Sequence, residues 1–146
     1  INRISLCCFS LCSHFSKIKS LVLHAGDARR GGGTAALAAG LSPHAPYSVS
    51  EALFRAAAAA SDYLAIHCAE TAEEQQFLRD GSGPFADLLS DLGRLPANAS
   101  PPGVGAVRWL DQLGVLRENT QLIHCQELER GDAELVLDVT LSARRR

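Results

Sequence analysis

Two histidines in this sequence occupy the same kind of position, at the end of an apolar run. His67 closes the run YLAIH and His124 closes the run TQLIH, and a cysteine follows each of them. If both runs are parallel strands, their carboxyl ends open at the same mouth of the sheet, where the functional groups of α/β folds gather. Two neutral imidazoles placed there could share a cation. The alternative is an ordinary one, in which each histidine is a partly buried polar residue bonded to a backbone carbonyl.

A carboxylate, Glu70, follows His67 by three residues. This spacing puts the carboxylate just beyond the strand, near the same mouth, without forcing it to bind the metal. A metal-bound water with its pKa lowered to about 7 needs a neighbouring group that takes its proton and passes it to the leaving group. Glu70 fits that role. Its alternative is an acid at the start of a helix, stabilised by the helix dipole.

A third histidine, His44, lies in the stretch LSPHAPYSVS, between Pro43 and Pro46. The prolines restrict the backbone on both sides and hold the imidazole at the end of the preceding strand. The site could therefore include a third ring. The alternative is a rigid strand-to-helix turn whose histidine faces water.

The elements that would position these residues alternate along the chain. Apolar runs at 36–44, 63–68 and 120–125 are typical of short buried strands. Ser48 with Glu51 three residues later has the pattern of a capping box at a helix start, and Gly81 is placed to end a second helix. Strands separated by helices indicate βα units and a parallel sheet. The expected helical segments are 48–63, 71–80, 85–93, 106–114 and 126–139, the last interrupted at Gly131.

Three segments in this order resemble the metal-dependent amidohydrolase superfamily: GLSPHAPYSVS, HCAETAEEQQFLRDGSGPFADLL and NTQLIHCQEL. The closest branch is that of the cytosine, guanine and adenosine-type deaminases and chlorohydrolases, and the resemblance spans 36–130. It implies a (β/α)₈ barrel with one divalent metal, Zn²⁺ or Fe²⁺. It also implies that His67 and His124 bind this metal, that Glu70 is the catalytic residue of an HxxE motif, and that His44 binds substrate.

The chain departs from this family's pattern at the other metal ligands. The HxH pair of the first strand is absent, because His14 and His24 are isolated, and Asp132 and Asp138 follow His124 too closely to match the family's late aspartate. A whole barrel takes about 250 residues, whereas this chain has 146 and no methionine. We therefore expect an α/β fragment of a TIM-type barrel with about three central βα units, from a truncated or frame-shifted coding region.

Composition divides the chain into an atypical segment, 1–35, a partial barrel, 36–138, and a basic tail, 139–146. The first segment is expected to pack poorly and to stay outside the site. The second carries six Lys/Arg and fifteen Asp/Glu, a net charge of −9, which argues against nucleic-acid binding. The apolar run 4–12 is too short to span a membrane and is a poor signal peptide. The five cysteines show no CxxC spacing and suit reduced thiols in the cytoplasm.

The function expected from these features is that of a metal-dependent hydrolase of C–N bonds other than peptide bonds. Its substrate would be a small nitrogen heterocycle, such as a purine, pyrimidine or triazine, that loses an amino group. One alternative is an inactive fragment, or a piece that works only after assembly, because open sheet edges favour homo-oligomers. Another is a small α/β binding domain whose histidines are structural. With the HxH and Asp ligands missing, we expect the chain alone to bind metal weakly and to show no measurable deamination.

Overall fold

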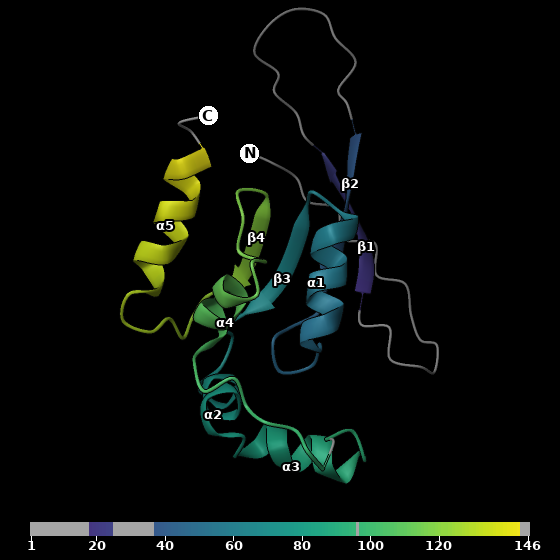
Figure 1. The fold of residues 1–146 in the computed structure, drawn as a ribbon, viewed down its shortest axis with the longest axis vertical. Coiled ribbons are helices and arrows are strands. Elements are labelled where there is room, and N and C mark those ends of the chain that lie inside the picture. Colours follow the sequence, from purple (N-terminus) through teal and green to yellow (C-terminus); the bar gives the residue numbers. More distant parts are fainter. Residues whose placement is uncertain (1–17, 25–36, 96, 144–146) are drawn as a thin grey trace, which may run out of the picture.

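The structure is a computed structural model that describes residues 18–24, 37–95 and 97–143. Its centre is a four-stranded sheet in the order β1-β2-β3-β4 (Figure 1). Strands β2, β3 and β4 run parallel to one another, which confirms the predicted α/β fold with parallel neighbouring strands. The strands are β1 (Ile18–His24), β2 (Leu37–Pro43), β3 (Leu64–Cys68) and β4 (Thr120–His124).

Strand β1 is an element that the sequence analysis missed. It pairs antiparallel with β2 over seven residues, from Ile18 opposite Pro43 to His24 opposite Leu37. The sheet is therefore mixed, whereas the strands of a (β/α)₈ barrel are all parallel. The rest of the segment 1–35, for which poor packing was expected, lies outside the described residues.

The helices that follow β2 and β3 each begin after a residue whose side-chain hydroxyl caps the helix. Helix α1 begins after Ser50, whose Oγ accepts a hydrogen bond from the Leu53 backbone at 3.3 Å, so the predicted cap at Ser48 is wrong. Helix α2 begins after Thr71 and ends at Gly81, whose φ of 74° is the left-handed conformation expected there. The helices are α1 (Glu51–Ala60), α2 (Ala72–Asp80), α3 (Pro84–Asp91), α4 (Ala106–Gln112) and α5 (Asp132–Ala143).

The predicted start of the last helix is also wrong. The sequence favoured a helix from Gln126, but α5 begins at Asp132, directly after Gly131 with a φ of 90°. The preceding residues instead form a loop that follows β4. This loop returns toward β3, because the backbone amides of Gln126 and Glu127 both donate to the Ala69 carbonyl at 2.9 Å.

The hydrophobic core lies between the parallel strands and helices α1, α2 and α4. Leu64 and Ile66 of β3 are fully buried, as are Phe54 of α1 and Leu110 of α4. Phe54 meets Trp109 edge to face with ring centroids 5.7 Å apart, which joins α1 to α4. Helices α2 and α3 lie beyond the carboxyl end of β3 (Figure 1), so they border the mouth where the histidines lie.

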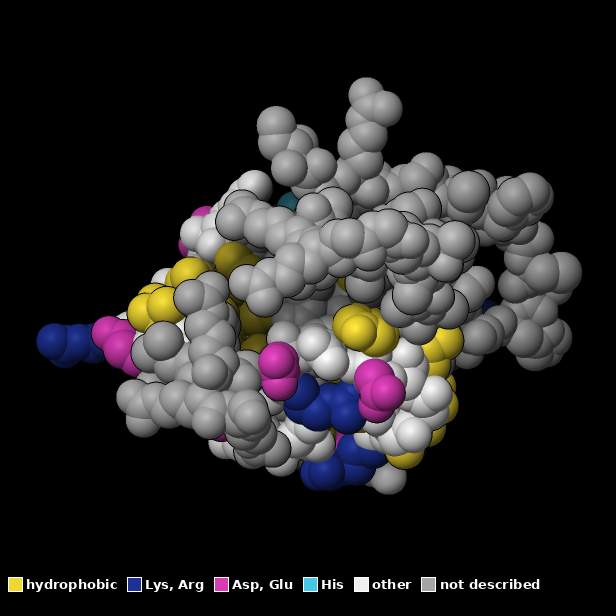
Figure 2. Space-filling model, turned by 90° about the horizontal axis from the view of Figure 1, so that it is seen from above, with side chains coloured by type: hydrophobic (Ala, Val, Ile, Leu, Met, Phe, Trp, Pro, Cys, Tyr) yellow, Lys and Arg dark blue, Asp and Glu magenta, His cyan; other side chains and the backbone are white. Residues whose placement is uncertain are grey.

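Helix α3 has no buried residue. Its Leu88 is exposed, and so is Leu92, which follows the last residue of the helix. On the face seen in Figure 2, acidic and basic side chains of the described residues lie next to one another and do not separate by sign.

Within the residues that the structure describes, no helix has the length and apolar character needed to cross a bilayer.

Candidate metal centre

Three of the residues singled out in the sequence meet at the carboxyl ends of β3 and β4. His67 Nδ1 lies 3.0 Å from His124 Nε2, and the two rings stack with centroids 5.1 Å apart. Glu70 Oε1 lies 3.5 Å from the same His124 nitrogen. One ligand atom from each of the three residues falls within 4.8 Å of the others. The expected convergence of these side chains is thus present in the structure.

The two histidines do not occupy equivalent positions in the sheet, although their sequences suggest it. The register pairs His67 with Ile123, and His124 with Cys68. Because side chains alternate along a strand, a regular β4 would direct His124 to the same side as Cys68 and away from His67. The φ of 79° at His124 breaks this alternation. A non-glycine residue in this region is uncommon and costs of order 1–3 kcal/mol, which is typical of functional positions.

His44 joins the same mouth from β2. Its carbonyl accepts from the His67 backbone amide at 2.9 Å, which continues the pairing beyond the end of β2. The rings of His44 and His67 lie with centroids 5.4 Å apart. His44 Nδ1 is 2.7 Å from Ser48 Oγ, and that hydroxyl also contacts the Ala45 carbonyl at 3.2 Å. Since the hydroxyl has one proton and a carbonyl can only accept, Ser48 donates to Ala45 and accepts from Nδ1–H. This tautomer leaves Nε2 of His44 as the acceptor nitrogen.

Ser48 is therefore a site residue that sequence reasoning misassigned. The spacing of Ser48 and Glu51 imitated a capping box, but Ser50 caps the helix and Ser48 orients His44. The sequence did contain one sign of this contact, because Ser48 follows His44 by four residues in a turn that prolines restrict.

Tyr47 forms an aromatic wall beside the histidines. Its ring meets His44 edge to face at 5.7 Å and stacks flat on Phe85 of α3 at 4.1 Å. Burial raises the pKa of Tyr47, and the nearby carboxylates of Glu70 and Glu74 raise that pKa further. The phenol is thus neutral and able to donate a hydrogen bond near the mouth.

The donor set fits a zinc-type ion. Two imidazole nitrogens and a carboxylate oxygen are common zinc ligands, and catalytic sites of this kind use three protein ligands. Two nitrogens bound to one tetrahedral Zn²⁺ would stand about 3.3 Å apart, close to the 3.0 Å between His67 and His124. The residues present can therefore hold a divalent metal, with Glu70 either as the third ligand or beside it.

The remaining histidines and aspartates do not complete this centre within the described part of the chain. His24 lies at the far end of the sheet, since its backbone pairs with Leu37 at the start of β2. His14 lies outside the described residues. Asp132 is fully buried at the start of α5, where its Oδ2 accepts from the Glu129 amide at 2.8 Å and its Oδ1 lies 3.6 Å from Arg108 Nε. Asp132 thus has a structural role at the start of α5.

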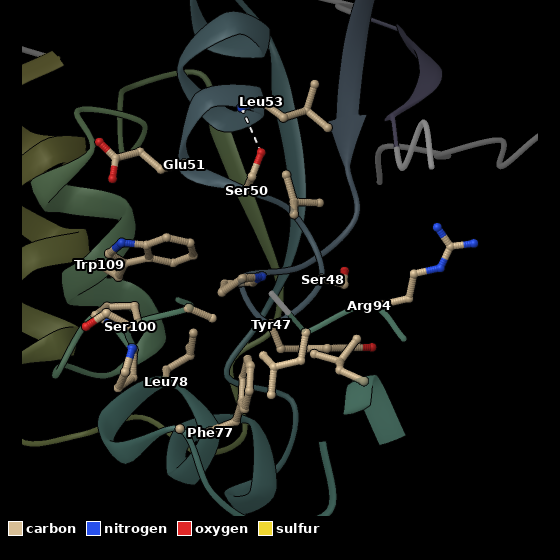
Figure 3. A pocket seen from close by; sticks show the side chains of 18 residues that line it. Tyr47, Ser48, Ser50, Glu51, Leu53, Phe77, Leu78, Arg94, Ser100 and Trp109 are labelled. Carbon is tan, nitrogen blue, oxygen red and sulfur yellow. Dashed lines mark hydrogen bonds between the residues drawn. The ribbon is translucent and has the colours of Figure 1, made fainter. Parts of the chain in front are cut away.

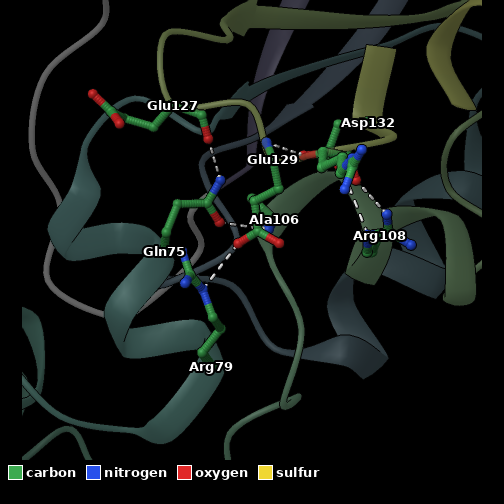
Figure 4. A network of polar contacts seen from close by, with 8 residues as sticks. Gln75, Arg79, Ala106, Arg108, Glu127, Glu129 and Asp132 are labelled. Carbon is green, nitrogen blue, oxygen red and sulfur yellow. Dashed lines mark hydrogen bonds and ion pairs between the residues drawn. The ribbon is translucent and has the colours of Figure 1, made fainter. Parts of the chain in front are cut away.

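A polar network holds the loop after His124 in place (Figure 4). Gln75 of α2 is 2% exposed; its Oε1 accepts from the Ala106 amide at 2.9 Å and its Nε2 donates to the Glu127 carbonyl. Arg79 pairs with Glu129 at 2.9 Å. Through these contacts α2, which follows Glu70, is tied to the loop that follows His124.

A pocket that Tyr47 helps to line is bordered by residues of α1, α2 and α4 (Figure 3). Its volume is about 710 Å³, and Tyr47, Phe77, Leu78 and Trp109 contribute to its largely apolar wall. None of His67, Glu70 and His124 lines it. It is therefore distinct from the centre at the strand ends.

Comparison with known proteins finds deaminases that are similar to part of this chain. No protein-family model matches the chain. A curated relative, the aminodeoxyfutalosine deaminase of Deinococcus radiodurans, is 38% identical over 102 residues, an alignment that covers 58% of this chain and 23% of the relative. The chain is a partial relative of the amidohydrolase-superfamily deaminases. The resemblance stated from the sequence is thereby confirmed at the level of the family.

The deaminase relatives are much longer than the matching part of this chain. A solved structure of an adenosine deaminase from Xanthomonas campestris with bound zinc has 24% sequence identity and a TM-score of 0.48, covering 67% of this chain and 19% of that one. The chain thus spans about a quarter of the curated deaminase and about a fifth of the solved one.

Proposed function

We propose that this chain supplies the central part of a metal-dependent deaminase that hydrolyses a C–N bond, other than a peptide bond, in a nitrogen heterocycle. The observation that carries this proposal is the meeting of His67, Glu70 and His124 at the ends of two parallel strands. The deaminase name of the curated relative supports the reaction class. The substrate class is a purine, pyrimidine or triazine that carries an amino group.

In this proposal His67 and His124 hold the metal, which is Zn²⁺ or Fe²⁺. When bound, such an ion lowers the pKa of water to about 7 and so supplies a nucleophile at neutral pH. Glu70 accepts one proton of the attacking water and delivers it to the ring nitrogen. The second proton of that water, on the hydroxyl that the attack adds to the ring carbon, passes to the amine, which departs as ammonia and leaves a ring carbonyl. Its Oε1 lies 3.5 Å from His124 Nε2, which keeps the carboxylate beside the ligands.

His44 binds and orients the substrate in the same scheme. Ser48 fixes its ring by the 2.7 Å contact to Nδ1 and leaves Nε2 as an acceptor. An acceptor at this place can receive a hydrogen bond from a ring N–H or an exocyclic amino group. Tyr47, with its neutral phenol, supplies a donor and an apolar face on the same side.

The barrel and the division of the chain belong to the same proposal. Residues 36–138 would form about three central βα units of a (β/α)₈ barrel, with 1–35 as an atypical segment and 139–146 as a basic tail. The order strand, helix, strand and the mouth at the carboxyl ends support it. The antiparallel β1 stands where such a barrel would have a parallel strand.

A second candidate is a piece that acts only after assembly with further strands. Within the described residues β4 is the outer strand of the sheet, and its residues are only partly buried or exposed. An open strand edge of this kind pairs readily with another strand. In this case the metal ligands are completed by another polypeptide or by another copy of the chain.

The test uses a chimera in which this chain's segment replaces the matching segment of the curated deaminase. Glu70→Gln should retain metal but lose about 10²- to 10⁴-fold in turnover, because the amide cannot accept the water's proton. His67→Ala should lower metal content, and His44→Ala should raise KM with metal in place. Near-normal turnover of metal-loaded Glu70→Gln would contradict the proton-transfer role.

The chain by itself provides the complementary measurement. We expect it to bind Zn²⁺ weakly through His67 and His124 and to show no measurable deamination of aminated purines, pyrimidines or triazines. Zinc affinity that does not change in His67→Ala would show that the metal binds elsewhere. Affinity that rises with chain concentration, together with a larger hydrodynamic mass, would favour the assembly candidate.

A further inference from the structure

Glu74 is a buried carboxylate next to the candidate centre that the proposed reaction does not use. It lies in the first turn of α2 and is 1% exposed. Its Oε2 accepts a hydrogen bond from the Glu70 backbone amide at 2.8 Å, and its Oε1 has no hydrogen-bond partner among the described residues. A glutamate is almost never fully buried unless it is paired, because removing its charge from water is costly. The burial of Glu74 is therefore unfavourable unless its carboxylate has a structural or functional role.

The local sequence explains how Glu74 reaches Glu70. Thr71 caps α2, and its Oγ1 accepts from the Glu74 amide at 3.2 Å, which is half of a capping box. In the usual box the glutamate side chain reaches back to the amide of the capping residue itself. Here it reaches one residue further, to the amide of Glu70. The carboxylate therefore acts on the residue that carries the proposed proton transfer.

The backbone that Glu74 holds is a strained turn. Ala69, between His67 and Glu70, has a φ of 51°, which costs a non-glycine residue of order 1–3 kcal/mol. The turn is fixed from both sides. The loop after His124 donates two hydrogen bonds to the Ala69 carbonyl at 2.9 Å, and Glu74 accepts the amide of Glu70.

We propose that Glu74 is a positioning residue, which fixes the backbone of Glu70 and thereby sets its carboxylate beside the imidazoles of His67 and His124. This inference rests on the proposed metal site. Burial raises the pKa of Glu74, whereas its hydrogen bond from the Glu70 amide lowers it, and an ionised carboxylate accepts a hydrogen bond roughly twice as strong as a neutral acceptor does. Removing a group that holds a metal-site residue in this indirect way typically costs 10- to 100-fold in metal affinity or activity. Because Glu70 transfers a proton in the proposed site and does not hold the metal, the loss is expected in turnover.

The experiment compares Glu74→Leu with Glu74→Gln in the full chain. Leucine fills similar space but cannot accept the Glu70 amide, whereas glutamine keeps a carbonyl acceptor. In Glu74→Leu we expect the Glu70 amide proton to move upfield in ¹H–¹⁵N spectra and to exchange faster with solvent, while the zinc Kd, which depends on His67 and His124, stays unchanged. In the chimera, Glu74→Leu should lower turnover about tenfold or more. In Glu74→Gln the amide should stay protected and the turnover of the chimera should remain within about threefold of the original, because a neutral acceptor still holds the turn.

Two controls separate positioning from general effects on the fold. Glu73→Leu removes a charge of the same sign from the same helix turn, at an exposed position, and should leave the Glu70 amide and the turnover of the chimera unchanged. Leu110→Ala opens a cavity in the core at α4 and should lower stability by about 2–5 kcal/mol without moving either readout.

The outcomes keep this inference distinct from the proposed function. An unchanged Glu70 amide in Glu74→Leu, or a loss of turnover in Leu110→Ala as large as in Glu74→Leu, would overturn the positioning role. If the original chain binds no zinc while the Glu70 amide responds to Glu74→Leu as expected, the metal site fails and the hold of Glu74 on Glu70 stands.

Discussion

The ends of β3 and β4 share a sequence form but differ in their surroundings. β3 lies between β2 and β4, and Leu64, Ala65 and Ile66 are buried on both of its faces. β4 is the outer strand of the described sheet, with residues that are partly buried or exposed. His67 stays within the regular strand, whereas His124 has a φ of 79°. The two similar motifs thus place their imidazole rings at the same point, one through a regular strand and the other through a left-handed backbone conformation.

This difference shows which part of the site depends on the core and which depends on local backbone conformation. His67 is placed by a buried strand whose neighbours fix it on both sides. His124 is placed by a departure from strand geometry that the loop after it must stabilise, and the network around Gln75 supplies contacts to that loop. Strained positions persist only where the surrounding structure over-determines them. Each strand end should therefore respond differently to substitution.

The largest difference is expected in the stability lost on substituting Ile66 of β3 or its register partner Leu122 of β4. Ile66→Ala should lower the free energy of unfolding by about 2–5 kcal/mol, because it leaves a cavity in the centre of the core. Leu122→Ala should cost about half as much, since Leu122 is only partly buried on the outer strand. Urea unfolding of both variants measures the two values. Equal costs would mean that another strand covers β4 in solution.

A smaller effect, of opposite sign at the two strand ends, is expected for glycine in place of each histidine. His67→Gly should destabilise the metal-free fold by about 0.5–1 kcal/mol, because glycine weakens a strand interior. His124→Gly should stabilise it by about 0.5–1 kcal/mol, because glycine adopts the positive φ without strain.

The control for this pair is His124→Ala, measured like the others by urea unfolding with a chelator present. Alanine removes the ring but keeps the strain at φ 79°, so no stabilisation should appear. If alanine and glycine stabilise equally, the gain comes from losing the ring and not from the backbone. All three variants should bind zinc more weakly than the original chain, since each lacks an imidazole.

The sequence predicted the strands and the meeting of the histidines because apolar runs followed by polar residues are visible without tertiary information. The expected strand 63–68 differs from β3 by one residue, and 120–125 differs from β4 by one. The one-residue offset between His67 and His124 was not predictable, because the left-handed conformation at His124 depends on the loop beyond it. Nothing in TQLIHC marks that conformation.

Other misses have different physical causes. Ser48 and Ser50 can both cap a helix, and only the position of His44 shows which serine does so. Strand β1 was missed because its run lies in a segment without a clear period, and a strand at a sheet edge depends on its partner more than on its own sequence. Glu74 could have been found, since Thr71 and Glu74 have capping-box spacing.

The two cysteines that follow the histidines should show the smallest difference between the strand ends, in their rate of alkylation. Burial is the main cause that raises the pKa of both thiols, with Glu74 adding to it. Cys68 is fully buried in β3, whereas Cys125 is partly exposed after β4. The thiolate is the reactive form, so both should react slowly at pH 7 and faster as the pH rises, with Cys68 on the order of tenfold slower than Cys125.

Iodoacetamide labelling followed by peptide mass spectrometry resolves each cysteine, and in urea the two rates should converge. A Cys68 that reacts as fast as Cys125 in the folded chain would show that the end of β3 opens as readily as the end of β4, and the contrast between a buried and an exposed strand end would not hold.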